Sequence, residues 1–187
     1  MEKHGCLRSE DPVSDLPDET QVFSLLNYVR CPKNIIQHCI SVSKIALDIL
    51  SDFEGRVETN RKLVYVGALL HDVGRTITHG INHGVVGAVL LRHHGFPYPI
   101  AMIAERHIGA GIPAEEAWAL GLPRKDYLPT TIEEKLVTYS DKLLMGTKRI
   151  TAKESMNQLA KILGAGHPAL ARFKQLHEEI SKLRGKI

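Results

Sequence analysis

Apolar residues recur at three- and four-residue steps along most of the chain, which is the spacing of one helix face. The clearest stripe lies in segment 33–52, where Ile35, Val42, Ile45 and Ile49 fall on one side. No segment alternates with a period of two, and the chain has no low-complexity tract and no internal repeat. The pattern predicts an all-α fold without strands, a single-domain bundle of about eight helices.

Capping residues, proline and glycine set the expected ends of these helices. Segment 61–74 is apolar nearly all round, which predicts a central helix that Gly74 terminates. Thr131 and Thr151 are each followed three residues later by glutamate, the pattern of a capping box. Gly87 lies in a later helix and permits close packing there. The expected helix starts are Asp18 or Thr20, Lys33, Asn60, Gly80 or Asn82, Pro97 or Pro99, Thr131, Thr151 and Pro168.

We expect three parts along the chain. Residues 1–18 are polar and aperiodic and predict a loose tail. Residues 19–150 form the main helical domain, and residues 151–187 form C-terminal helices packed on its core. Within the domain, Gly109–Pro129 is rich in glycine and proline and predicts a loop that could form a lid over a pocket.

Composition narrows the class of protein. A net charge of +3 without a basic run gives no strong signal for nucleic-acid binding. The three cysteines, Cys6, Cys31 and Cys39, fit free thiols in a reducing compartment. The polar N-terminus lacks the apolar core of a signal peptide, and the longest apolar run is too short to span a bilayer. We therefore expect a cytoplasmic protein with no membrane partner, and oligomerisation stays open.

Polar side chains interrupt the apolar stripes of four predicted helices. His38, His71, His107 and Asp141 stand where the pattern calls for apolar residues, and Asp72 follows His71. Isolated buried imidazoles and carboxylates are costly, so these groups are most simply satisfied by meeting one another. The core of a helical bundle is a common place for a metal site built in this way. A polar cluster without a metal is the alternative.

The types of ligand restrict the metal. Imidazole and carboxylate without thiolate suit one or two divalent transition metal ions (Fe, Mn, Co, Ni or Zn) and argue against an all-oxygen calcium cage. Cys39 is adjacent to His38 and therefore points roughly 100° away around the helix. We interpret Cys39 as a core residue.

The order His38, His71-Asp72, Asp141 resembles the signature of the HD superfamily of metal-dependent phosphohydrolases. The segment GALLHDVG is similar to the central motif of that superfamily, and VTYSDKL is similar to its terminal Asp helix. The resemblance covers about residues 20–145 and is closest to small HDIG-type predicted hydrolases. Arg75 departs from that subgroup, which usually has lysine at this position. The planar guanidinium of arginine therefore replaces the compact ammonium of lysine.

The resemblance implies an HD-domain fold over 19–150 and hydrolysis of a phosphomonoester or phosphodiester, of a nucleotide in particular, by a metal-activated hydroxide. It implies that His38, His71, Asp72 and Asp141 hold one metal, and that Asp72 bridges to a second metal held by His83 and His107. Two such ions can stabilise both the attacking and the leaving oxygen of a phosphoryl displacement. The expected catalytic residues are Asp72, His71 and Arg75, and the expected substrate-binding residues are Arg75, Arg106, Lys142 and His79.

Other interpretations stay open. His83 and His107 can be ordinary helix-end residues, with Asn82 capping the helix that follows it, and the basic side chains can simply extend into solvent. The same ligand set also suits a mixed-valent di-iron oxygenase, which would consume dioxygen and lose activity when manganese replaces iron. A non-catalytic nucleotide-binding or regulatory module would bind a nucleotide without turning it over.

Overall fold

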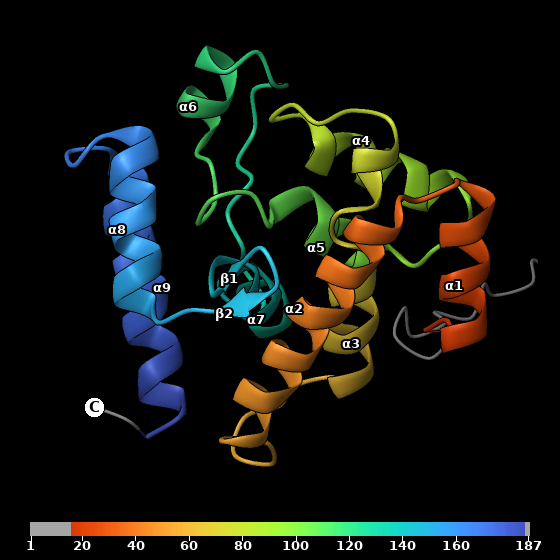
Figure 1. Cartoon of the computed structure of the whole chain (residues 1–187), viewed down its shortest axis with the longest axis horizontal. Coiled ribbons are helices and arrows are strands. Elements are labelled where there is room, and N and C mark those ends of the chain that lie inside the picture. Colours follow the sequence, from red (N-terminus) through yellow and green to blue (C-terminus); the bar gives the residue numbers. More distant parts are fainter. Residues whose placement is uncertain (1–15, 186–187) are drawn as a thin grey trace, which may run out of the picture.

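The computed structural model describes residues 16–185, which fold into nine α-helices, one 3-10 helix and one short hairpin (Figure 1). The prediction of an all-α fold is confirmed, while the predicted tail lies mostly outside the described residues. The helices are α1 (Glu19–Tyr28), α2 (Lys33–Ser51), α3 (Arg61–Leu70), α4 (His83–His93), α5 (Tyr98–Arg106), α6 (Ala114–Ala119), α7 (Ile132–Lys142), α8 (Ala152–Leu163) and α9 (Pro168–Leu183). The 3-10 helix η1 spans Val73–Thr76, and the strands are β1 (Leu144–Met145) and β2 (Lys148–Arg149).

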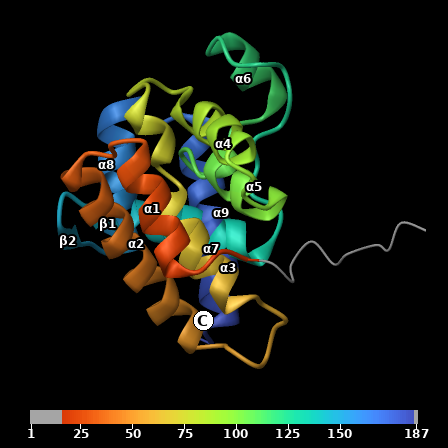
Figure 2. The ribbon, with the colours of Figure 1, turned by 90° about the vertical axis from the view of Figure 1, so that its right-hand side faces the viewer.

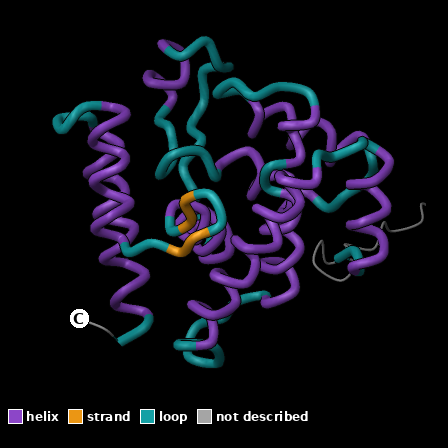
Figure 3. The backbone as a smooth tube through the Cα atoms, in the orientation of Figure 1, coloured by secondary structure: helices purple, strands orange, loops and turns teal. Residues whose placement is uncertain are grey.

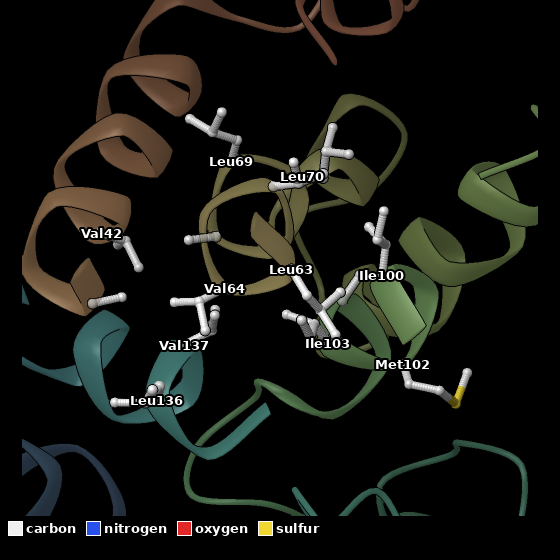
Figure 4. Packing of buried hydrophobic residues seen from close by; sticks show 14 of the residues in the cluster. Val42, Leu63, Val64, Leu69, Leu70, Ile100, Met102, Ile103, Leu136 and Val137 are labelled. Carbon is white, nitrogen blue, oxygen red and sulfur yellow. The ribbon is translucent and has the colours of Figure 1, made fainter. Parts of the chain in front are cut away.

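Helix α3 is the centre of the bundle, as its apolar sequence predicts. It contacts α1, α2, α5 and α7, and Figure 4 shows Val42, Val64 and Val137 of three different helices pointing toward one another. Val64 and Leu70 are fully buried. Burial of each such large aliphatic side chain contributes about 1.5–3 kcal/mol, so α3 anchors the helices that carry the polar residues of interest.

Two glycines let the backbones around α3 approach closely. A Cβ on Gly67 would overlap the side chain of Ile103, where α3 crosses α5. A Cβ on Gly74 would lie 2.6 Å from the backbone nitrogen of Gly87. The turn after α3 therefore packs directly on α4, and the prediction that Gly87 permits close packing is confirmed. Helix α3 itself ends at Leu70, earlier than the predicted Gly74, and η1 follows.

Most predicted caps form. Asp18 and Gln21 make a capping box, Asn60 accepts a hydrogen bond from the backbone of Leu63, and Thr151 and Glu154 make a second box. Asn82 is an exception, because its side chain makes no capping hydrogen bond and its Oδ1 accepts one from Thr78 instead.

The Gly109–Pro129 segment was predicted to be a loop, but it contains helix α6. Ile112 and Tyr127 exchange two backbone hydrogen bonds at its base, and they form a small core with Ala117 and Leu122 that is separate from the main one. The prediction missed this core because no long periodic stripe marks a helix of six residues.

The C-terminal helices α8 and α9 pack against each other, and α9 also contacts α7 (Figures 1 and 2). Phe173 of α9 is fully buried and stacks on Tyr139 of α7 at 5.9 Å between ring centroids. The β1–β2 hairpin after α7, drawn in orange in Figure 3, corrects the prediction that the chain has no strands. Strands of two residues are too short to give an alternating pattern. Within residues 16–185, every helix is too short or too polar to cross a bilayer.

Candidate metal centre

The helix ends around α3 bring six of the predicted site residues into one cluster. On one side, His38 Nε2 of α2 lies 3.0 Å from Asp141 Oδ1 of α7 and 3.7 Å from Asp72 Oδ2. His71 Nε2 at the end of α3 lies 3.7 Å from the same Asp141 oxygen and 3.9 Å from Asp72 Oδ2. Four polar side chains from three helices and the turn after α3 therefore meet at one point.

The other oxygen of Asp72 faces a second group of imidazoles. Asp72 Oδ1 lies 3.1 Å from His83 Nε2 at the start of α4 and 3.4 Å from His107 Nε2 at the end of α5. The two imidazole nitrogens are 3.1 Å apart. One carboxylate thus lies between two ligand groups, with one oxygen toward each.

Helix ends fix the orientation of three of the four histidines. His71 and His107 follow the last residues of α3 and α5, where backbone carbonyls have no partner within the helix. Their Nδ1 atoms donate to Ala68 O at 2.7 Å and Ala104 O at 2.8 Å. His83 begins α4, and its Nδ1 donates at 2.8 Å to Gly80 O in the turn before that helix. With the proton on Nδ1, the Nε2 lone pair of each neutral ring is available to a metal.

The distances within the cluster fit a shared cation. Ligand atoms at about 2.1 Å from one ion stand roughly 3.0 Å apart when adjacent in octahedral geometry and roughly 4.2 Å apart when opposite. The separations between each Nε2 and the carboxylate oxygens of Asp72 and Asp141 run from 3.0 to 3.9 Å. Three groups of residues could hold a metal: His38 with His71 and Asp72, His71 with His107 and Asp141, and Asp72 with His83 and His107.

Two orphaned atoms give an independent test of this fit. Among the described residues, neither His71 Nε2 nor Asp72 Oδ1 has a hydrogen-bond partner, although both atoms are buried. An unsatisfied buried polar atom costs about 1–3 kcal/mol, and more when it is charged. A cation on each side of Asp72 would satisfy both atoms.

Electrostatics keep the two carboxylates ionised. Burial alone raises the pKa of Asp72, but His71, His107 and His83 outweigh it and hold that pKa well below its usual range. Burial likewise raises the pKa of Asp141, while the Lys142 ammonium and the neighbouring imidazoles bring it well below the ordinary value. Both side chains are therefore anionic at neutral pH, which is the state of a metal ligand.

The imidazoles differ in their protonation. Burial lowers the pKa of His107 to about 4, against the opposing effect of Asp72, so this ring is neutral at pH 7. Burial also lowers the pKa of His71, but the sulfur of Cys39 and the carboxylates of Asp72 and Asp141 outweigh it and raise that pKa well above 6.5. The negative charge of the centre therefore attracts a cation to His71 Nε2, either a proton or a metal. Cys39 is buried, free and in none of the three groups that could hold a metal, in keeping with the predicted core role.

A cavity of about 580 Å³ opens onto one side of the cluster. Arg75 and Lys142 line it as expected, with Arg75 Nε 2.7 Å from Asp72 Oδ2 and Lys142 Nζ 2.6 Å from Asp141 Oδ2. His83 and His107 do not line it and lie behind Asp72, 5% and 2% exposed. The full lining is Asn34, Ile35, Gln37, His38, Ser41, Asp72, Arg75, Asp141, Lys142, Gly146 and Thr147.

The structure does not bring Arg106 to this cavity, which corrects the prediction that it contacts substrate here. Arg106 Nη1 donates to both carboxylate oxygens of Glu134, at 2.9 and 3.0 Å, and to Thr130 at 2.8 Å. These residues line a different pocket, of about 700 Å³. The cause is helical geometry, because adjacent residues on α5 point roughly 100° apart and His107 takes the direction of the cluster.

The same pairing explains why the predicted capping box at Thr131 is only half formed. Thr131 accepts the backbone N–H of Glu134, but the Glu134 carboxylate turns to Arg106 and to the N–H of Thr130.

His79 also stays away from the cluster, since it is exposed and does not line the cavity. No residue of the 109–129 segment lines the cavity either, so the prediction of a lid over this pocket is not supported.

Sequence reasoning missed several cavity residues. Asn34, Gln37 and Ser41 share the face of α2 that carries His38, and their spacing around a predicted ligand was a usable signal. Gly146 and Thr147 form the turn of the unpredicted hairpin. Nothing in the local pattern marked them.

Comparison with known proteins agrees with this geometry. Residues 35–146 match the family model of the HD domain, and that range contains all six residues of the cluster. The chain belongs to the HD domain superfamily of metal-dependent phosphohydrolases.

Individual relatives place the chain in more detail. It is 49% identical over 154 residues to an uncharacterized protein of Methanocaldococcus jannaschii, across 82% of this chain and 91% of that one. It is 42% identical over 184 residues to the tRNA (cytidine(56)-2'-O)-methyltransferase of Picrophilus torridus, across 98% of this chain but only 50% of that relative's length. The HD domain of the Listeria monocytogenes phosphodiesterase PgpH, in complex with cyclic-di-AMP, aligns with a TM-score of 0.54 at 16% identity, over 88% of this chain and 96% of that one. That likeness shows a shared fold.

Proposed function

We propose that the protein is a metal-dependent phosphohydrolase that cleaves a phosphomonoester or phosphodiester of a small compound, a nucleotide in particular. The observation that carries the proposal is the position of Asp72, whose two oxygens face separate groups of ligands. In the proposed centre, His38, His71, Asp72 and Asp141 would hold one ion, and Asp72 would also serve a second ion held by His83 and His107.

The metal ions, when bound, would supply activation of water and neutralise the charge that develops on phosphorus oxygens during displacement. The residues of the chain prepare the site for that chemistry. Asp72 and Asp141 stay ionised at neutral pH, and the backbone holds His71, His83 and His107 with Nε2 toward the centre. These contacts fix the ligand geometry before an ion arrives.

Two basic side chains are placed to bind the phosphate. Arg75 uses Nε to hold Asp72 and has no other hydrogen-bond partner among residues 16–185, so its two terminal nitrogens can donate to phosphate oxygens in the cavity. Lys142 lines the same cavity, beside Asp141. Both are proposed to bind substrate, with Arg75, His71 and Asp72 as the residues closest to the reaction.

The cavity and the comparisons support a small substrate. A volume of about 580 Å³ lies within the range typical of small-molecule sites. The fold is shared with an HD domain whose structure holds cyclic-di-AMP, a small phosphodiester. Cleavage of that class of bond is accordingly among the activities to be tested first.

The experiment begins with metal analysis of protein purified without chelators. Phosphorylated metabolites, including nucleotides and cyclic nucleotides, are then screened with added iron, manganese, cobalt or nickel, and Asp72→Asn serves as the control. The proposal expects release of phosphate or of a monoester with at least one metal, and none from the control. A metal-loaded protein that binds a nucleotide without hydrolysing any compound would contradict the proposal, and so would metal-dependent consumption of dioxygen.

A further inference from the structure

One wall of the cavity consists of uncharged hydrogen-bonding side chains. Asn34, Gln37 and Ser41 lie on α2 at three- and four-residue steps and line the cavity beside His38. Asn34 and Gln37 are exposed, and neither side-chain amide has a hydrogen-bond partner among the described residues. Two free amides therefore face the space next to the candidate metal centre.

The turn of the β1–β2 hairpin forms another wall of the cavity. Gly146 and Thr147 line the cavity there, and the φ of +61° at Gly146 lets the chain turn tightly without a side chain in the way. Thr147 adds a hydroxyl. The two walls thus offer amides and hydroxyls, while the charged groups Arg75 and Lys142 lie at the end with the carboxylates.

The spacing along α2 relates this wall to a bound phosphate. A phosphate at the centre lies beside His38, and Asn34 is one helical turn away, about 6 Å along the axis. The hydroxyls of a phosphorylated pentose are a few covalent bonds from phosphorus, which is roughly the same distance. A group that extends from the phosphate along α2 therefore reaches these amides.

The chemistry of the lining favours a sugar at that place. Amides carry both acceptor and donor atoms, as do hydroxyls, so Asn34 and Gln37 can pair reciprocally with a diol. Planar bases are usually held by stacking on aromatic side chains. No phenylalanine, tyrosine or tryptophan among the described residues lines this cavity, and Ile35 is its one large apolar member. The only ring in this described lining is the imidazole of His38, which is engaged with Asp141 at 3.0 Å.

We propose that Asn34 and Gln37 form a subsite for the polyhydroxylated, ribosyl-like part of the phosphorylated substrate, and that a base attached to that sugar lies outside and is not selected. The proposal rests on the proposed function for the position of the phosphate. It assigns the two amides to substrate binding and not to catalysis.

Equilibrium binding to manganese-loaded protein tests the subsite without requiring turnover. The probes are the phosphonate analogue of ribose 5-phosphate and benzylphosphonate, which carries an aryl group in place of the sugar. The variants are Asn34→Ala, Gln37→Ala and the double variant, with Asn157→Ala, an exposed asparagine on α8, as the matched control.

The sugar phosphonate should bind wild type about tenfold more tightly than benzylphosphonate, and the double variant should lose that preference. Benzylphosphonate affinity should be the same in all variants, and the control should behave as wild type. Equal affinities in wild type, or a preference that survives in the double variant, would overturn the subsite.

Steady-state kinetics separate the subsite from the proposed function. Adenosine and cytidine monophosphates should have similar kcat/KM values, and p-nitrophenyl phosphate or its bis-ester reports on chemistry without a sugar. If the aryl esters are hydrolysed but kcat/KM differs strongly between the adenosine and cytidine monophosphates, the subsite alone would be contradicted. Absence of hydrolysis of every ester would contradict the proposed function, while the phosphonate titrations still decide the subsite.

Discussion

Substitution of Glu134 by alanine should destabilise the protein without disturbing its substrate site. The Glu134 side chain is 5% exposed and accepts two hydrogen bonds from Arg106 Nη1 and one from the N–H of Thr130. Removal of the carboxylate leaves the Arg106 guanidinium, which is 23% exposed, without its counter-charge. It also leaves the backbone N–H of Thr130 without its acceptor. A large loss of stability is expected, because both losses fall in a partly buried position.

The size of the effect follows from those two losses. Breaking a buried ion pair costs about 3–5 kcal/mol, and the residual exposure of Arg106 places this pair at the lower end. We therefore expect the free energy of unfolding to fall by about 3 kcal/mol. For a chain of this length, each kcal/mol lowers Tm by about 2–4 °C, so Tm should fall by about 6–12 °C.

Thermal and urea unfolding measure this change, and the chain offers a matched control. Glu115 pairs with Arg124 on the surface, where the side chains are 76% and 62% exposed. Glu115→Ala should change stability by no more than about 0.5 kcal/mol. Equal effects of the two substitutions would refute the assignment of Arg106 and Glu134 as a structural pair.

Kinetics test the same assignment from the functional side. Because Arg106 does not line the cavity, Glu134→Ala and Arg106→Ala should leave the KM of the folded enzyme near the wild-type value. A rise in KM of tenfold or more in Arg106→Ala, well below its Tm, would restore the role in substrate binding that the sequence predicted.

Three further predictions concern the centre itself. Asp72→Ala should abolish hydrolysis while circular dichroism keeps its helical signal, because one carboxylate serves both ligand groups; an active variant would contradict this. Chelated protein should regain activity with iron, manganese, cobalt or nickel but poorly with magnesium, which prefers oxygen ligands; full activity with magnesium alone would argue against imidazole ligands. His83→Ala or His107→Ala should lower bound metal from about two ions per chain to about one, with a steep loss of kcat; unchanged metal content would mean that the second site does not exist.

The polar residues of the cluster could be predicted because each breaks an apolar pattern. His38, His71 and Asp141 stand on stripes that must face the core, so their meeting place was already limited by the helices that carry them. His107 was found in the same way. The structure brings these side chains together, and their role as ligands stays a prediction until a metal is measured.

The positions of the Arg106 and His79 side chains could not be predicted from the sequence. Both were chosen because they lie near ligands in the sequence, but adjacent helical residues point in different directions and a loop residue has no face. Arg106 pairs with the buried Glu134, which is 28 residues away along the chain. The capping-box pattern that includes Glu134 does not indicate this partner. Distant pairings of this kind depend on the packed fold, as does the hairpin that closes one wall of the cavity.

Diffraction from crystals grown with manganese, recorded for its anomalous signal, tests the central claim most directly. The account predicts two manganese peaks on either side of the Asp72 carboxylate, one against His38, His71 and Asp141 and the other against His83 and His107. A single peak at the first position would contradict the dinuclear centre. Peaks elsewhere, with none beside Asp72, would contradict the metal centre altogether.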